Sequence, residues 1–148
     1  MKMKLLSADG TKVYALVFDK GDEVIGELQR FAEQERLDSA HFTAIGAFQS
    51  VVLQYFNPLT RAYEDIPVAE QVEVLILAGN VALDQEGLKI HAHSVVGLRD
   101  GSTRGGHLKE AYVSPTLEVV VEETPGFLRR RYDQASGLTL IDLDSTEG

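Results

Sequence analysis

Short apolar segments separated by turn residues dominate this sequence and constrain its fold more than any other feature. They are rich in β-branched and aromatic residues and end at Gly, Pro, Asn or Asp, as strands do. The predicted strands cover residues 13–18, 40–47, 51–56, 61–66, 72–77, 78–83, 88–98, 117–121 and 138–143. Most are joined by short turns, whereas a parallel sheet needs a helix between most strand pairs. The pattern predicts an α+β fold with a mainly antiparallel sheet.

One helix is predicted against these strands. Residues 22 to about 36 carry apolar side chains at three- and four-residue steps, which is typical of an amphipathic helix packed on a sheet. Asp22 is the expected N-cap. Residues 99–106 contain three glycines and predict a loop, and residues 127–132 fit either a short helix or an edge segment.

The length of 148 residues predicts a single domain over residues 1–148, with residues 144–148 as a frayed polar tail. Several strands, such as residues 13–18, are apolar on both sets of alternating side chains. Such strands require cover on both faces of the sheet. Because one helix cannot cover both faces, the sequence predicts a homo-oligomer whose subunits bury the open face.

Charge and hydropathy argue against two classes of partner. The net charge of -9 disfavours direct DNA binding, since nucleic-acid affinity depends on Lys and Arg that neutralise phosphates, and the sequence has no AT-hook. The basic run Arg129-Arg130-Arg131 is interpreted as a water-facing surface or as subunit salt bridges, with a phosphate contact as the alternative. No apolar run approaches the ~20 residues of a membrane span. The N-terminal lysines lack a following apolar region, so a cytoplasmic location is expected.

Histidines are the candidate metal ligands, because the chain has no cysteine. His91 and His93 lie on one predicted strand, where alternate side chains share a face and their Cα atoms lie ~7 Å apart. His107 follows Gly105-Gly106, a pair that lets the backbone approach without side-chain obstruction. Three imidazoles with an open position are typical of a catalytic or ligand-binding zinc site. The alternative is that these histidines hydrogen-bond across strands without a metal.

Two other polar residues are candidates for the site. His41 has no potential partners nearby in sequence and is expected on the surface or in a cross-strand contact. Glu73 is an acid in an otherwise apolar strand, which indicates a paired or sheet-edge residue more often than a catalytic one, although the catalytic alternative stays open.

Several of these segments together resemble the plant and prokaryote conserved (PPC) domain, as a stand-alone prokaryotic member. The similarity extends from about Leu5 to Leu143, and its most specific part combines His-x-His with Gly-Gly-His-Leu. The segments that carry it are Ala44-Ile45-Gly46-Ala47 leading into residues 51–56, Glu73-Val74-Leu75 with Gly79-Asn80, Ile90-His91-Ala92-His93, Gly105-Gly106-His107-Leu108 and Thr116-Leu117-Glu118-Val119.

The resemblance implies an α+β domain that assembles as a homotrimer. Plant members accompany AT-hooks, and stand-alone prokaryotic members are commonly labelled DNA-binding. At the level of fold the family resembles acetolactate decarboxylase, in which three histidines hold zinc. By that likeness His91, His93 and His107 are the implied ligands of zinc or another divalent transition metal. Glu73 and Glu118 are the implied candidates for a supporting or proton-transfer role.

Two functions follow from these observations. The first is a trimeric module whose metal and glycine-rich segment bind a small molecule or a protein partner without turnover. The alternative is a zinc-dependent enzyme that acts on a small carbonyl or ester substrate. Because neutral imidazole is the metal ligand, metal loss is expected as the pH falls well below about 6.5.

Overall fold

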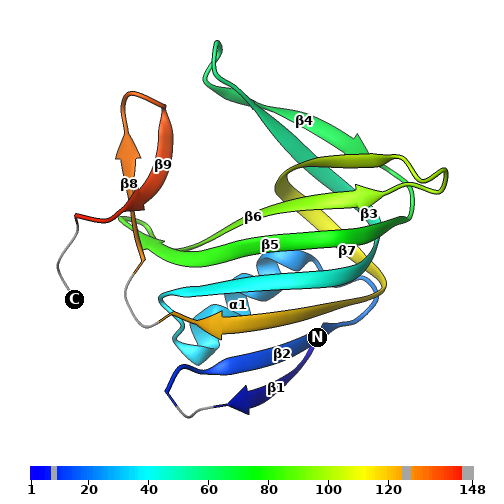
Figure 1. The fold of residues 1–148 in the computed structure, drawn as a ribbon, viewed down its shortest axis with the longest axis horizontal. Helices are drawn as coiled ribbons and strands as arrows, with labels where there is room; N and C mark the ends of the chain where they lie inside the picture. Colours follow the sequence, from blue (N-terminus) through cyan, green and yellow to red (C-terminus); the bar gives the residue numbers. More distant parts are fainter. Residues whose placement is uncertain (8–9, 125–127, 145–148) are drawn as a thin grey trace.

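The computed structural model describes residues 1–7, 10–124 and 128–144, and it has the predicted α+β fold. A single sheet contains the strands of this part of the chain, and one helix packs on it (Figure 1). The elements in chain order are β1 Lys2–Ser7, β2 Val13–Phe18, α1 Val24–Glu35, β3 Ala40–Asn57, β4 Ala62–Val68, β5 Val72–Asp84, β6 Gly87–Gly97, β7 Thr103–Glu123, β8 Arg129–Asp133 and β9 Leu138–Asp142.

Neighbouring strands follow the order β1-β2-β7-β3-β5-β8-β9, with β4 paired to β3 and β6 paired to both β5 and β7. Every pairing is antiparallel apart from one parallel bridge between β5 and β8. The mainly antiparallel prediction is therefore confirmed. The β8–β9 hairpin projects from the end of β5, beside β6 (Figure 1).

Helix α1 covers one face of the sheet (Figure 1). Its apolar side chains, Leu28 and Phe31 among them, join buried residues of the strands in one core. The Phe31 ring meets the Tyr14 ring of β2 edge-on, with centroids 5.1 Å apart. The N-cap is Glu23, whose carboxylate accepts hydrogen bonds from the backbone N–H groups of Ile25 and Gly26. The prediction that Asp22 is the N-cap was wrong, because the Asp22 carboxylate pairs with the N-terminal amine, 2.8 Å away.

Several strands are longer than predicted, because they bend at register shifts instead of ending. Residues 40–47 and 51–56 belong to one strand, β3, and residues 72–77 and 78–83 to another, β5. Bulges let a strand change direction while its pairing continues, so glycine and polar residues inside it do not terminate it. Strand β1 was not predicted at all.

The sheet face opposite α1 carries exposed apolar side chains in its centre. Val17, Ile45, Ile76 and Val120 have exposed fractions of 39%, 58%, 41% and 47%. They come from four different strands, and with neighbouring residues they line a shallow hollow of about 440 Å³. We call this surface the open face. Its exposure agrees with the expectation that one helix leaves part of the sheet without cover.

Two sequence predictions fall partly on residues that the structure does not describe. In the tail predicted at 144–148, residues 145–148 lie outside the described residues. Within 127–132, residue 127 also lies outside them, while 129–132 form part of β8 rather than a helix. No helix in the described ranges is long and apolar enough to span a membrane.

Candidate metal centre and its pocket

The β6–β7 hairpin brings the three predicted histidines together. His93 on β6 lies directly opposite His107 on β7, and His91 lies two residues before His93. Ala92, between the two β6 histidines, is buried, so His91 and His93 project from the other side of the strand as expected. The predicted loop at 99–106 was too long, because residues 103–106 already pair with β6.

Gly106 permits this arrangement. Strand β7 passes against β3 at this point, and a Cβ atom at Gly106 would lie 2.6 Å from the carbonyl oxygen of Gln54. At Gly105 the nearest atom to such a Cβ would be Val95 Cγ2, at an ordinary 3.4 Å. The expectation that glycine allows close backbone approach before His107 therefore applies to Gly106.

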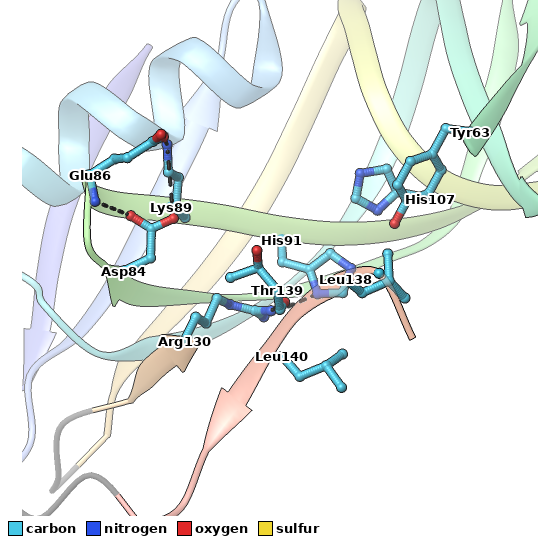
Figure 2. Close-up of a pocket in the computed structure, with 11 residues that line it drawn as sticks. Tyr63, Asp84, Glu86, Lys89, His91, His107, Arg130, Leu138, Thr139 and Leu140 are labelled. Carbon is cyan, nitrogen blue, oxygen red and sulfur yellow. Dashed lines mark hydrogen bonds and ion pairs between the residues drawn. The ribbon is translucent and has the colours of Figure 1, made fainter. Parts of the chain in front are cut away.

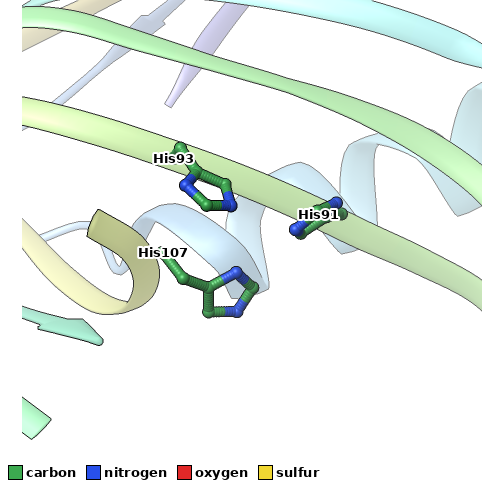
Figure 3. Close-up of side chains that lie close together, drawn as sticks. All are labelled: His91, His93 and His107. Atoms are coloured by element: carbon green, nitrogen blue, oxygen red, sulfur yellow. The ribbon is translucent and has the colours of Figure 1, made fainter. Parts of the chain in front are cut away.

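The three imidazoles form a nearly regular triangle (Figure 3). Ring centroids are 5.1 Å apart for His91–His93, 5.1 Å for His91–His107 and 5.4 Å for His93–His107. One nitrogen from each ring lies within 4.8 Å of the others. A tetrahedral zinc ion with Zn–N bonds of ~2.0–2.1 Å needs these nitrogens roughly 3.4 Å apart, so small ring rotations are sufficient.

The electrostatic state of the rings also suits a metal. Burial, followed by Arg130 and the other two histidines, lowers the pKa of His91 to about 4. Burial, followed by His93 and Arg130, also lowers the pKa of His107. Both rings are therefore neutral at pH 7, as ligation requires. Nδ1 of His107 is buried with no hydrogen-bond partner among the described residues. The donor set fits a transition metal.

A pocket of about 460 Å³ adjoins the histidines (Figure 2). His91 and His107 lie in its wall, and the Tyr63 ring packs beside His107 with centroids 4.9 Å apart. The remaining lining comes from the ends of β5 and β6 around their turn and from the β8–β9 hairpin. These residues are Asp84, Glu86, Lys89, Arg130, Gly137, Leu138, Thr139 and Leu140.

Arg130 is a site residue that the sequence reasoning missed. Its Nη2 donates to Oδ1 of Asn80 at 2.8 Å and contacts Nδ1 of His91 at 3.1 Å. The interpretation of Arg129-Arg130-Arg131 as a water-facing run is wrong for Arg130. It holds for Arg131, which is exposed and pairs with Asp142 at 3.2 Å. Alternation along a strand was the available signal, because it sends the middle arginine to the opposite face.

The two acidic candidates are not brought to the histidines. Glu73 lies opposite Gly97 of β6, four residues and roughly 13 Å along the strand from His93. Glu118 lies eleven positions after His107 on β7 and borders the open face. Neither lines the pocket, where Asp84 and Glu86 are the acids. His41 is exposed and lies 3.7 Å from Glu122, a cross-strand contact as expected.

The lowered pKa of His91 predicts acid sensitivity of the metal-free protein. An unfolded histidine has a pKa of about 6.5, so between that pH and about 4 the unfolded chain binds a proton that folded His91 does not. The free energy of unfolding should therefore fall as the pH falls through this window, by up to about 3 kcal/mol. Urea unfolding with chelator at pH 7 and pH 4.5 measures this change. His91→Gln should reduce it, and an unchanged pH dependence would contradict the assignment.

The sequence matches the Plants and Prokaryotes Conserved (PCC) domain over residues 6–125. The chain belongs to this family. PCC is the family named above as PPC, so the resemblance is confirmed, and the match contains all three histidines. Residues 128–144, with the β8–β9 hairpin and Arg130, follow the matched region.

Solved structures agree with the PCC assignment. A candidate DNA-binding protein from Bacteroides thetaiotaomicron is 29% identical, with 95% of this chain and 96% of that chain covered and a TM-score of 0.84. A metal-containing protein from Archaeoglobus fulgidus is 30% identical, with 95% and 96% covered and a TM-score of 0.82. A plant- and prokaryote-conserved protein from Pyrococcus horikoshii is 26% identical, with 95% and 94% covered and a TM-score of 0.83.

A more distant likeness concerns the fold alone. Acetolactate decarboxylase from Bacillus subtilis is 12% identical, with 78% of this chain and 54% of that chain covered and a TM-score of 0.57. The expected fold-level likeness of the PCC domain to this enzyme is confirmed. A comparison with curated protein sequences gives no significant match.

Proposed function

We propose that this PCC-domain protein binds a divalent transition metal, zinc in the first instance, through His91, His93 and His107 and presents it to a small-molecule ligand. One observation carries the proposal: three imidazole nitrogens lie within 4.8 Å of one another, and two of the three rings line a cavity of about 460 Å³. The description of the Archaeoglobus fulgidus relative as metal-containing supports it. Cavities of this size hold small organic ligands.

Such a metal would act as a Lewis acid toward a ligand atom in its open position. The protein's own contribution is to keep the metal-binding imidazoles neutral and partly shielded from water in the pocket wall. Tyr63 packs against His107 and restricts its ring, and the half-buried His91 and His107 are not protonated at pH 7. These features favour metal binding over protonation of the same nitrogens.

The proposal includes assembly as a homotrimer. Its support is the open face, where Val17, Ile45, Ile76 and Val120 leave apolar area exposed to water. Pairing across the strands aligns His93 with Ala78, Thr43 and Val120 in one row. The histidines therefore border the same face, and an adjacent subunit would lie close to the pocket.

Catalysis is the second candidate, as a zinc-dependent reaction on a small carbonyl or ester substrate. The observation that favours it is the set of groups able to exchange protons in the pocket, Tyr63, Asp84 and Glu86. Likeness to a decarboxylase in fold does not transfer its reaction. Turnover of a small ester or 2-oxo acid by the metal-loaded protein would establish catalysis, and binding without turnover would favour the module.

Direct DNA binding is not part of the proposal, although a relative carries that description. The net charge is -9, and the basic run does not form a footprint for phosphates. Arg130 lies in the pocket wall, and the adjacent Arg131 pairs with Asp142.

Elemental analysis of purified protein tests the metal site. Wild-type protein supplied with zinc should carry about one ion per chain, and His93→Ala should carry almost none, because two imidazoles alone bind far more weakly. His41→Ala is the matched control, since His41 is exposed outside the cluster, and it should retain the wild-type content. Wild-type protein without stoichiometric metal, or equal metal in His93→Ala, would rule the site out.

A further inference from the structure

Arg130 is a cation in the pocket wall that makes no direct ion pair in the described residues, although Asp84 attracts it from beyond ion-pair distance. Burial lowers the pKa of its guanidinium, although an arginine stays charged at neutral pH. No carboxylate in the described part of the chain lies within salt-bridge distance of it. The acids across the pocket, Asp84 and Glu86, both lie within ion-pair distance of Lys89 instead, at 4.0 and 2.9 Å. A half-buried charge without a partner is unfavourable unless a ligand supplies one.

The hydrogen bonds of Arg130 leave two of its N–H groups without acceptors. Nη1 donates to the carbonyl oxygen of Thr139 at 3.0 Å, and Nη2 is taken by Asn80 and His91. Nε is buried with no hydrogen-bond partner among the described residues. A guanidinium has five N–H groups, so Nε and one hydrogen of Nη1 have no acceptor in this arrangement. Because Nε is buried, the terminal nitrogens Nη1 and Nη2 are the ones that a ligand in the pocket would contact.

The contact with His91 links Arg130 to the metal site. Arginine only donates hydrogen bonds, so Nδ1 of His91 must be the acceptor in the 3.1 Å contact. A neutral His91 that binds a metal through Nε2 carries its proton on Nδ1, and one that binds through Nδ1 has no lone pair left there. In both cases the hydrogen bond is lost. Metal binding therefore frees a further donor of Arg130 toward the pocket.

We infer that Arg130 binds the carboxylate of a small organic acid whose other polar group reaches the metal position. Figure 2 shows Arg130 and His91 pointing toward one another, with Leu138 and Leu140 of β9 beside them. The leucines and the Tyr63 ring offer apolar walls to the body of such an acid. Planar carboxylates match the paired N–H groups of a guanidinium, and such charge-assisted bonds are among the stronger ones in proteins.

This inference rests on the proposed metal site for its second contact, whereas the Arg130 contact can be tested separately. Pyruvate is a suitable probe because it joins a carbonyl to a carboxylate, and methyl pyruvate lacks the charge. Calorimetric titration of wild-type protein, Arg130→Gln and Arg131→Gln should be run with and without zinc. Metal content is measured on the same samples. Arg131 is the matched control, since it lies next in sequence but pairs with Asp142.

Wild type and Arg131→Gln should bind pyruvate with similar affinity, and Arg130→Gln should bind it at least about tenfold more weakly. Without zinc, the affinity of wild type for pyruvate should also be lower. Arg130→Lys keeps the charge but not the paired N–H groups, so its pyruvate affinity should lie between those of wild type and Arg130→Gln. Such an intermediate affinity would show that the weaker binding of Arg130→Gln does not come from unfolding. Equal pyruvate affinity in wild type and Arg130→Gln, equal affinity for methyl pyruvate, preference for inorganic phosphate, or no binding at millimolar pyruvate would each overturn the inference. If no zinc binds but pyruvate still depends on Arg130, the metal proposal fails and the carboxylate site stands.

Discussion

Replacing Gly106 with alanine is expected to destabilise the protein by about 2–3 kcal/mol and to weaken metal binding at the same time. The added Cβ would lie 2.6 Å from the carbonyl oxygen of Gln54, a backbone atom that cannot rotate away. Strands β3 and β7 must separate at this point, as in other overpacked sites. Because Gln54 pairs directly with His107, the separation would displace that histidine.

Gly105→Ala is the matched control for this change. Its Cβ would meet Val95 Cγ2 at 3.4 Å and the Ser94 carbonyl oxygen at 3.5 Å, which are ordinary contacts. We expect its free energy of unfolding to lie within about 1 kcal/mol of wild type and its metal content to be unchanged. Urea unfolding and elemental analysis of both variants provide the comparison. Equal stability of the two variants would show that the β3–β7 approach at Gly106 is looser than described.

A lysine in place of Val120 is expected to convert the proposed trimer into monomers. Val120 lies in the open face, opposite Thr43 of β3 and Ala15 of β2. Association would bury the new ammonium group against apolar neighbours, which is strongly unfavourable without a partner charge. In the isolated subunit the same side chain reaches water, so the monomer itself should stay folded.

Light scattering coupled to size-exclusion chromatography measures this outcome. Wild-type protein should have three times the mass of one chain, and Val120→Lys the mass of one. Gln71→Lys adds the same charge at an exposed position between β4 and β5 and should keep the wild-type mass. Monomeric wild-type protein, or a trimeric Val120→Lys, would contradict assembly through the open face.

Local patterns were sufficient to predict the helix, most strands and the histidine pair on β6. Period-two alternation identified the shared face of His91 and His93 directly. The third candidate ligand, His107, was predicted from the glycines before it and from the family resemblance, but the residues before it were predicted as a loop. Glycine-rich segments normally interrupt strands. Here the close approach of the Gln54 carbonyl requires glycine at position 106, inside the strand.

The rest of the site depends on contacts between distant segments. Arg130 reaches His91 because β8 meets β5 through a single parallel bridge, Leu83 to Arg129, and no local pattern encodes that contact. Glu73 stood out in the sequence as an acid among apolar residues. Its place opposite Gly97, near the far end of β6, follows from strand register, which composition does not specify.

The proposed metal-binding residues and the proposed carboxylate-binding residue of the pocket belong to different parts of the fold. The histidines belong to the main sheet, whereas Arg130, Leu138 and Leu140 belong to a hairpin that follows the PCC match. Among the described residues, its backbone link to β5 includes the Leu83–Arg129 bridge and the 3.0 Å hydrogen bond from Leu83 N–H to the Leu128 carbonyl. Exchange of this hairpin for another sequence would thus leave the proposed metal ligands intact while changing the preference for the proposed carboxylate ligand. The domain is therefore suited to modular redesign, in which the three histidines stay constant and the hairpin is exchanged to alter ligand selectivity.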